Sequence, residues 1–449
     1  MAKIVIVGGG ISGLAAAYTL GKDGRHEVVL LEASDRLGGK VATDRVDDFL
    51  IERGPDSIFS MKPAAVDLIT ELGMEDELMG PKGSEFSILV GGRLHHVPRA
   101  LATMMPGAAG VLEKVGFLSA AAKRRVLSEK EAPKGSGNDE SIASFFRRRF
   151  GKKFSSLVAE PLLAGIHAGD PEKLSMKALY PTYLGLEQKN GSLTGAAPPP
   201  PPASGARKPA FLALRGGMGT LVDRLESRLE NVQVHKGARV ESIERNGSGL
   251  QVKGSVELKA DHVILGVPAY VASKLLERSA PETANTLSRI RYVSTAIVTL
   301  AYPKAAFPKG LEGNGFLVPY EEPCDITGCT WTSQKWEDRA PDDVHLLRIF
   351  MGLDGRLNVD EHTDAELVEK AKAAIASIMS PVLPPSFERI DRWTRAMPQY
   401  ELGHLNLLEK AEEGLRGMPI RFVGSSYRGN GIPDCVRQGR EAANALLET

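Results

Sequence analysis

Two short apolar runs near the start of the chain have the composition of strands that are buried on both faces. They are Lys3–Gly8 and His26–Leu31, and isoleucine, leucine and valine fill most of their positions. Between them, Leu14–Leu20 combines small and apolar residues in the way expected of a helix that packs closely on a sheet. A strand, a helix and a second strand in this order predict a βαβ unit, which belongs to a parallel sheet.

Turn-forming residues divide the next part of the chain into shorter elements. Lys40–Val46 and Phe49–Arg53 predict a hairpin across two aspartates. From residue 63 to about residue 207 the apolar spacing is mostly helical, with a short strand pair at Phe86–His95. The run Pro198–Pro202 cannot pack in a core, and it predicts an exposed linker or disordered loop.

Strand patterns return in the second half of the chain. Val232–His235 and His262–Leu265 resemble the first two strands, which predicts that the domain with the βαβ unit is assembled from separated segments. Ser294–Tyr302 and Val344–Gly352 predict a second sheet within residues 285–395. We therefore expect an α/β protein with more than one domain.

Composition narrows the class of protein further. The 449 residues contain 56 Lys+Arg and 56 Asp+Glu, so no overall charge favours nucleic acid as a partner. No apolar run reaches the ~20 residues of a membrane-spanning helix. The three cysteines (Cys324, Cys329 and Cys435) are too few for a disulfide framework and lack the spacing of a zinc site. We expect reduced thiols and no metal.

A glycine-rich turn follows the first strand and opens the first helix. Gly8, Gly10 and Gly13 match the pattern G-x-G-x-x-G, with Ile11 and Ser12 between the last two glycines. These glycines permit a tight turn, the close approach of a pyrophosphate and close packing of helix on strand. The acid at the end of the second strand, Glu32, is placed to bind the ribose hydroxyls. Together these features predict a dinucleotide site, because they occur in the order that such a site requires.

The next residues extend this motif and indicate which dinucleotide binds. Glu32 and Ala33 are followed by Arg36, Gly38, Gly39 and Lys40. This stretch resembles the E-x-x-x-R-x-G-G motif of the FAD-dependent amine-oxidase-like superfamily. In that superfamily the arginine and the glycine backbone close over the pyrophosphate and the ribityl chain.

A second glycine-rich turn lies near the end of the chain. It runs from Gly424 to Gly431 and leads through Ile432, Pro433 and Asp434 into a helix. Backbone N–H groups at such a turn point to an electron-rich acceptor, and the pyrimidine edge of a flavin is one.

With these motifs the chain resembles the protoporphyrinogen oxidase family, which includes the bacterial coproporphyrinogen III oxidases. The resemblance extends over nearly the whole chain in the order of the family. Besides the FAD motifs, it is carried by Glu52–Ser57, Ala164–Ser175, Leu214–Met218, Trp393, Met397–Tyr400, Gly403, His404 and Tyr427–Cys435.

The resemblance implies a Rossmann-like FAD-binding domain, a mixed-sheet substrate domain and a helical domain that associates with a membrane surface. The FAD-binding domain would comprise residues 1–60, 208–270 and 390–449, the substrate domain residues 61–94 and 271–389, and the helical domain residues 95–207. It further implies that non-covalent FAD is held by Gly8, Gly10, Ile11, Ser12, Gly13, Glu32, Ala33, Arg36, Gly38, Gly39, Lys40, Gly54, Pro55, Asp56, Ser57, Val240, Trp393, Gly424, Gly431, Ile432, Pro433 and Asp434.

The implied reaction is a six-electron oxidation of a porphyrinogen to a porphyrin, in which oxygen reoxidises the flavin and yields hydrogen peroxide. Asp56 is the nearest candidate for a catalytic side chain, although a helix N-cap or hairpin role is an alternative. Gly165 and His167 occupy the family's substrate segment, where tyrosine or phenylalanine is common in place of the histidine. Phe86 aligns with an arginine of enzymes that act on protoporphyrinogen IX, so coproporphyrinogen III is the expected substrate and protoporphyrinogen IX the alternative.

The same sequence features are compatible with other functions. An amine oxidase or a carotenoid-type desaturase has the same FAD motifs, and a non-catalytic carrier could have the same fold. We expect a cytoplasmic monomer or homodimer with weak attachment to the membrane surface. Residues 111–127 and Phe145–Phe154 suggest this attachment, because both combine apolar residues with cations. Ordinary amphipathic helices would show the same pattern.

Overall fold

The computed structural model describes residues 1–98, 101, 109–194, 209–247 and 249–448. The chain forms two compact units, and each is made of separated segments. The first comprises Met1–Gly80, Lys208–Arg291 and His404–Thr449, and the second Pro81–Arg207 and Tyr292–Gly403. The predicted proline-rich loop lies outside the described residues.

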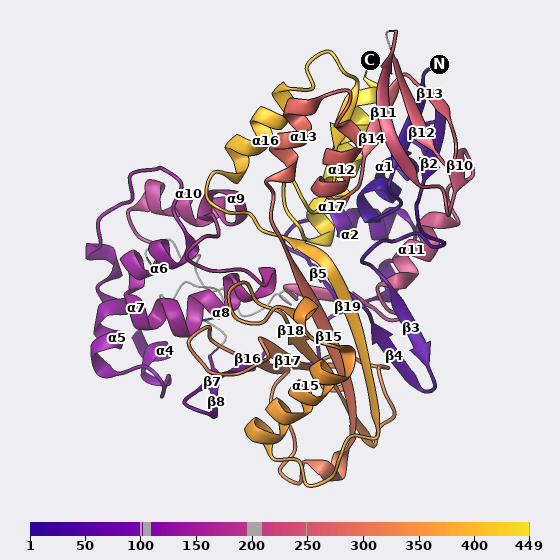
Figure 1. Cartoon of the computed structure of the whole chain (residues 1–449). Helices are drawn as coiled ribbons and strands as arrows, with labels where there is room; N and C mark the ends of the chain where they lie inside the picture. The colour runs from indigo at the N-terminus through magenta and orange to yellow at the C-terminus, as the bar shows by residue number, and fades with distance from the viewer. Residues whose placement is uncertain (99–100, 102–108, 195–208, 248, 449) are drawn as a thin grey trace. The chain divides into compact units, whose positions relative to one another are not determined.

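A parallel five-stranded sheet organises the first unit (Figure 1). Its strand order is β10-β2-β1-β14-β20, and all four strand pairs are parallel. The central strands are almost fully buried, which explains their uninterrupted apolar sequences. The strands are β1 (Lys3–Val7), β2 (Glu27–Leu31), β10 (Val232–His235), β14 (His262–Leu265) and β20 (Ile420–Phe422).

Further elements complete the first unit. Its remaining strands are β3 (Thr43–Val46), β4 (Phe49–Glu52), β5 (Ile58–Phe59), β6 (Leu78–Met79), β9 (Phe211–Leu214), β11 (Val240–Asn246), β12 (Gly249–Gly254) and β13 (Leu258–Ala260). Its helices are α1 (Ile11–Asp23), α2 (Ala64–Glu71), α11 (Gly219–Glu226), α12 (Ala269–Leu276), α13 (Pro281–Ser288), α16 (His404–Glu413) and α17 (Ile432–Leu447). The hairpin β3–β4, with Val46 opposite Phe49, confirms the prediction from the sequence.

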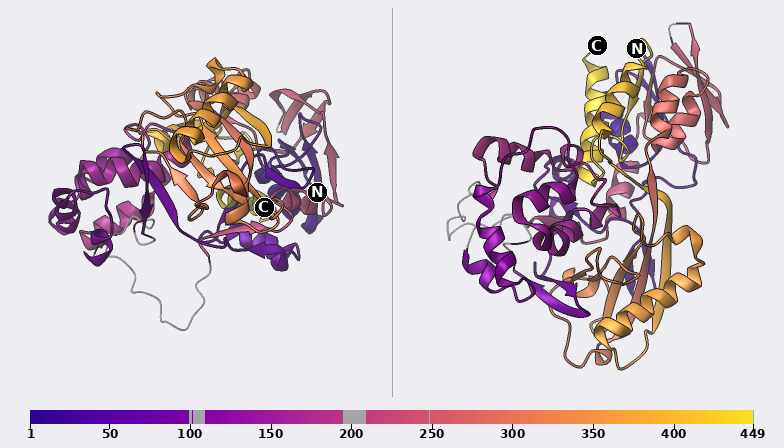
Figure 2. Two further views of the ribbon diagram at one scale, coloured as in Figure 1. Left: turned by 90° about the horizontal axis from the view of Figure 1, so that it is seen from below. Right: turned by 60° about the vertical axis from the view of Figure 1, so that its left-hand side comes forward.

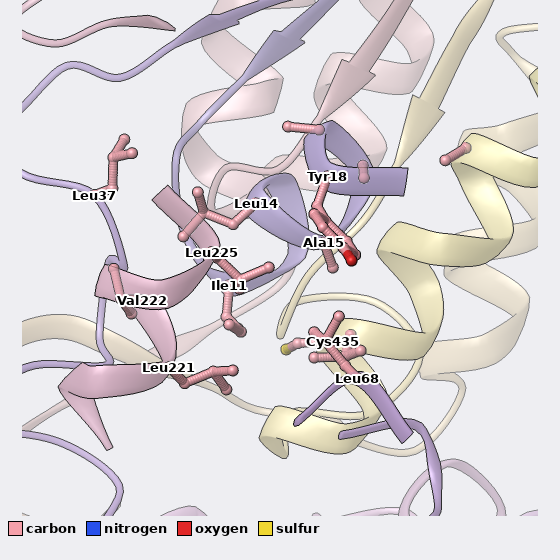
Figure 3. Packing of buried hydrophobic residues seen from close by; sticks show 14 of the residues in the cluster. Ile11, Leu14, Ala15, Tyr18, Leu37, Leu68, Leu221, Val222, Leu225 and Cys435 are labelled. Atoms are coloured by element: carbon pink, nitrogen blue, oxygen red, sulfur yellow. The ribbon is translucent and has the colours of Figure 1, made fainter. Parts of the chain in front are cut away.

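The core of the first unit forms around α1, which lies between α11 and α17. Figure 3 shows Ile11 and Leu14 of α1 among Leu221 and Leu225 of α11, while Cys435 of α17 lies beside Leu68 of α2. The contact between α1 and α17 is unusually close. A Cβ atom at Gly439 of α17 would lie only 2.2 Å from the backbone oxygen of Ser12, so this position requires glycine.

A seven-stranded mixed sheet organises the second unit. Its order is β19-β15-β18-β17-β16-β7-β8, in which only the pair β16–β7 is parallel. The strands are β7 (Phe86–Val90), β8 (Arg93–Val97), β15 (Tyr292–Pro303), β16 (Gly315–Leu317), β17 (Gly328–Trp331), β18 (Val344–Met351) and β19 (Phe387–Pro398). Helix α15 (Asp364–Met379) packs on this sheet, as Figure 2 shows, and α14 (Thr332–Lys335) lies beside β18. The predicted α/β class, with one parallel and one mixed sheet, is confirmed.

Short helices form the remaining part of the second unit. They are α4 (Ala109–Glu113), α5 (Ala120–Leu127), α6 (Ile142–Phe150), α7 (Lys152–Phe154), a π-helical turn η3 (Ser155–Ala159), α8 (Glu160–Leu163), the turn η4 (Gly165–His167), α9 (Met176–Leu179) and α10 (Pro181–Asn190). Phe145, Phe146, Phe150 and Phe154 are buried in their common core. These aromatic side chains therefore do not form the lipid-facing surface that the sequence pattern suggested.

Within the part of the chain that the structure describes, no helix combines the length and the hydropathy of a membrane span.

Candidate functional site

The glycine-rich turn after β1 leaves the N-terminal end of α1 open to a ligand. Gly8 has φ +104°, and a Cβ atom at Gly13 would lie 2.0 Å from the oxygen of Gly8, so both positions require glycine. A Cβ atom at Gly10 would meet no described atom within 4 Å. No side chain among the described residues caps α1, and its first turn contains no acid. The free N–H groups of this helix end favour an anion such as a pyrophosphate.

Glu32 stands at the carboxyl end of β2, beside this turn. Its Oε2 accepts the N–H of Gly9 at 2.7 Å, and its Oε1 accepts the N–H of Ser34 at 2.8 Å. The backbone oxygen of Glu32 also accepts the N–H of Ala238, which brings the start of β11, with Val240, to the same edge. These hydrogen bonds hold the Glu32 carboxylate in a fixed position at the carboxyl end of β2.

The double glycine packs directly on the first glycine turn. The N–H of Gly38 donates to Gly9 at 2.8 Å, and Gly38 and Gly39 both have positive φ values, +95° and +58°. Arg36 folds over this turn and donates to the backbone oxygen of Gly39 at 2.6 Å. The arginine thus supports the backbone of the turn, a role that the E-x-x-x-R-x-G-G pattern alone does not reveal.

Lys40 connects this turn to the second glycine-rich turn. Its Nζ donates to Oγ of Ser425 at 3.3 Å. Burial lowers the pKa of Lys40 to about 8, although the nearby Cys435 acts in the opposite direction. By its exposed area the Lys40 side chain is half buried.

The second glycine-rich turn leads from β20 into α17. Gly424 has φ +123°, and a Cβ atom there would lie 3.7 Å from Oγ of Ser12, so this turn is next to the start of α1. Helix α17 begins at Ile432, with Gly431 as its N-cap and Pro433 in its first turn. Asp434, also in the first turn, accepts two hydrogen bonds from Nζ of Lys62, at 2.9 and 2.7 Å.

The turn Gly54–Ser57 belongs to the same unit. Asp56 is half buried and accepts the hydroxyl of Ser57 at 2.9 Å. Strand β5 follows this turn, so Asp56 does not cap a helix. Glu52 has no role that its motif predicts; it is fully buried and accepts the N–H of Met218 at 2.7 Å. This carboxylate holds the Arg215–Gly219 turn in place. The sequence signal for this role is an acid at the end of an apolar strand.

The second unit contains the other predicted site residues. Trp393 lies in β19, opposite Thr295 of β15, and Phe86 lies in β7, where it packs against the core of the helical part. Gly165 begins η4, and a Cβ atom there would meet no described atom within 4 Å. Their placement relative to the first unit stays a prediction.

His167 is turned inward rather than outward. It is 5% exposed, and its Nε2 lies 3.1 Å from the hydroxyl of Tyr180, which itself donates to the oxygen of Leu163. The neighbouring Ile166 is 59% exposed. Gln399, which directly follows β19, donates to the backbone oxygen of His167 at 3.0 Å and so holds the turn η4 in place. In this turn the exposed side chain is therefore that of Ile166, and no feature of the sequence motif distinguishes it from its neighbours.

Glu32 and the turns after β1 and β20 lie at the carboxyl edge of the parallel sheet. The same unit contains the predicted cofactor residues other than Trp393. They are Gly8, Gly10, Ile11, Ser12, Gly13, Glu32, Ala33, Arg36, Gly38, Gly39, Lys40, Gly54, Pro55, Asp56, Ser57, Val240, Gly424, Gly431, Ile432, Pro433 and Asp434. Two helix N-termini, three glycine-rich turns and one ordered carboxylate suit an extended dinucleotide with a pyrophosphate at its centre.

Comparison with known proteins agrees with this geometry. A family model described as flavin-containing amine oxidoreductase matches residues 11–447. The coproporphyrinogen III oxidase of Bacillus subtilis is 34% identical over 99% of this chain and 97% of its own length. The protoporphyrinogen oxidase of Homo sapiens is 33% identical over 99% of this chain and 98% of its own length.

Solved structures show the same likeness. A crystal structure described as a protoporphyrinogen oxidase from an Exiguobacterium species has a TM-score of 0.87 and 33% identity, and it covers 100% of this chain and 99% of its own. A putrescine oxidase structure, at 18% identity, has a TM-score of 0.71 and covers 100% of this chain and 99% of its own. The second likeness concerns the fold alone.

Proposed function

Because the chain belongs to the flavin-containing amine oxidoreductase family and FAD is its cofactor, we propose that it oxidises a porphyrinogen to a porphyrin in haem biosynthesis. The observation that carries this proposal is the likeness over 99% of the chain to relatives named for porphyrinogen oxidation. At 34% identity the likeness extends through the helical part and the mixed sheet, which the FAD motifs do not include.

The residues of the first unit would bind FAD from one end to the other. Glu32 would hold the adenosine ribose, and the open end of α1 at Gly10 would hold the pyrophosphate. The turn Gly424–Gly431 and the first turn of α17 would meet the flavin half with backbone N–H groups. When bound, FAD supplies the hydride acceptor, so the protein's own task is to bind, orient and exclude water.

The overall reaction that we propose is balanced by three molecules of oxygen. A porphyrinogen loses six electrons and six protons, and three O2 become three H2O2. Asp56 lies in the turn Gly54–Ser57, which we expect beside the flavin, and we propose that it accepts protons from the substrate. Its half-buried position leaves the carboxylate accessible to such a role.

We propose coproporphyrinogen III as the preferred substrate, with protoporphyrinogen IX as the alternative. Relatives with either name match this chain at 28–34% identity, so overall identity does not separate the two. The absence of an arginine at Phe86 supports the more soluble substrate with four propionates. Gly165 and the exposed Ile166 of η4 are the residues of the second unit that we expect to contact the macrocycle, while His167 orients the turn.

Anaerobic reduction of the bound flavin by each porphyrinogen tests the proposal directly. We expect bleaching of the flavin absorption with coproporphyrinogen III, followed by oxygen uptake and peroxide formation when air is admitted. A comparison of kcat/KM for both substrates, with and without anionic liposomes, then tests the preference and the weak membrane attachment. Faster turnover of protoporphyrinogen IX in both conditions would overturn the substrate choice, and a flavin that neither substrate reduces would overturn the function.

A further inference from the structure

Lys62 and Asp434 form an ion pair between two segments that are distant in sequence. Lys62 lies in the turn between β5 and α2, and its Nζ contacts both carboxylate oxygens of Asp434, at 2.9 and 2.7 Å. The Asp434 side chain is only 12% exposed, whereas that of Lys62 is 51% exposed. The lysine therefore covers a nearly buried carboxylate from the solvent side.

Helix stability alone does not require this lysine. Asp434 stands in the first turn of α17, where a negative charge is already favourable because of the helix dipole. Lys62 itself is 51% exposed, so solvent screens part of its attraction to Asp434. The pair is better explained by what its charges do at the site that surrounds it.

The position of Asp434 places its charge at the flavin end of the cofactor site. A Cβ atom at Gly429 would lie 2.4 Å from Cγ of Asp434, so the carboxylate packs against the second glycine-rich turn. In the sheet order β10-β2-β1-β14-β20, the ribose carboxylate Glu32 follows β2 and this turn follows β20. A dinucleotide whose pyrophosphate lies over α1, after the central strand β1, therefore extends its flavin half toward α17.

We propose that Lys62 is a positioning residue that acts through Asp434 to favour the reduced form of bound FAD. Reduction adds negative charge to the pyrimidine half of a flavin. An uncompensated carboxylate at the first turn of α17 would oppose this charge, and Lys62 neutralises the carboxylate. This inference rests on FAD as the cofactor and does not depend on which substrate the flavin oxidises.

The test is the two-electron midpoint potential of FAD bound to the full-length protein, together with the dissociation constant of oxidised FAD. The variants are Lys62→Met, Lys62→Arg, Asp434→Asn and the double variant Lys62→Met/Asp434→Asn. Lys22→Met is the matched control, because Lys22 forms an ion pair with Glu71 at 2.7 Å at the opposite end of α1.

We expect Lys62→Met to weaken the binding of reduced FAD relative to oxidised FAD about tenfold, which corresponds to a potential lower by about 30 mV. Asp434→Asn should raise the potential, and the double variant should have a potential nearer to that of the wild type than Lys62→Met has. Lys62→Arg should keep the ratio of the dissociation constants of reduced and oxidised FAD within about twofold of the wild-type ratio. Lys22→Met should leave the potential unchanged.

Equal weakening of oxidised and reduced FAD by Lys62→Met would show a merely structural role and overturn the inference. A shift no larger than that of Lys22→Met would do the same. If Lys62→Met does not retain FAD, Asp434→Asn decides, because an unchanged potential in that variant also contradicts the inference. Shifts as expected in a protein that oxidises neither porphyrinogen would refute the proposed function and leave this inference intact.

Discussion

At the scale of single residues, the glycines of the nucleotide site fall into two groups. Gly13 and Gly439 allow close contacts within the protein, since a Cβ atom at either would lie 2.0 or 2.2 Å from a backbone oxygen. Gly10 differs, because it has an extended conformation with φ −67° and open space where its Cβ atom would lie. Gly13 and Gly439 are therefore needed for packing, whereas Gly10 leaves space for a ligand.

Alanine substitutions separate these two purposes. Gly10→Ala should leave the free energy of unfolding of the FAD-free protein within about 0.5 kcal/mol of wild type, because nothing obstructs the methyl group. It should raise the dissociation constant of FAD at least tenfold, because the methyl group occupies the pyrophosphate position. Gly439→Ala should instead destabilise the protein by about 1–3 kcal/mol through the clash with Ser12. Urea titration and FAD titration measure both quantities, and unchanged FAD affinity of Gly10→Ala would contradict the pyrophosphate assignment.

At the scale of elements, two buried carboxylates in the helical part of the second unit have opposite environments. Burial alone would raise the pKa of Glu129, but hydrogen bonds from Ser192, the N–H of Leu193 and Arg149 lower it below its ordinary value. Burial raises the pKa of Glu160, at the start of α8, and a hydrogen bond from Ser155 opposes this only in part. Hydrogen bonds thus compensate for the burial of the Glu129 charge, whereas the burial of the Glu160 charge is not fully compensated.

Replacement of each carboxylate by an amide should therefore shift stability in opposite directions. The Glu129 carboxylate stabilises the fold at pH values above its pKa in the unfolded state, and this effect is lost as pH falls through its lowered pKa in the folded state. Glu129→Gln should therefore lower the free energy of unfolding by about 3–5 kcal/mol at pH 7 and by much less at low pH. Glu160 opposes folding once pH rises through its raised pKa, so Glu160→Gln should add about 1 kcal/mol at pH 8 and little near pH 4.

Melting temperatures of the wild type and the two variants between pH 4 and pH 8 measure both effects. Stabilisation by Glu129→Gln, or a gain from Glu160→Gln that grows toward low pH, would contradict these environments.

At the scale of the whole molecule, the first unit is assembled from three segments of the chain. The last segment supplies β20 at the edge of the parallel sheet and α17 against α1. Because the predicted cofactor residues come from all three segments, the cofactor should stabilise their association.

Removal of FAD therefore should destabilise this protein measurably. Mild acid precipitation should release free FAD, since we propose that no covalent bond holds it. At a free FAD concentration of about 100 times its dissociation constant, rebinding should restore about 2.7 kcal/mol of stability. Calorimetry of the FAD-free protein with increasing FAD measures this gain, and ADP at the same multiple of its own dissociation constant is the matched control. Flavin that stays with the precipitated protein would contradict non-covalent binding.

The α/β class, the βαβ unit and the FAD motifs could all be predicted from the sequence, because each depends on a local pattern. A buried parallel strand needs a continuous apolar run, and a nucleotide turn needs glycines at fixed spacing, so both can be recognised within about forty residues. The family likeness followed from the same motifs together with those near the end of the chain.

The long-range partners of these residues, in contrast, are visible only in the folded protein. Phe145 and Phe154 are buried in a core and do not face a membrane, and His167 contacts Tyr180. Lys62 forms an ion pair with Asp434, which is 372 positions away in the sequence. A sequence pattern shows that a side chain is apolar or charged, but its burial depends on which elements pack against it. Those elements are distant along the chain. Their packing therefore determines which of these side chains are buried and which charges pair, and the chemistry of the site depends on both.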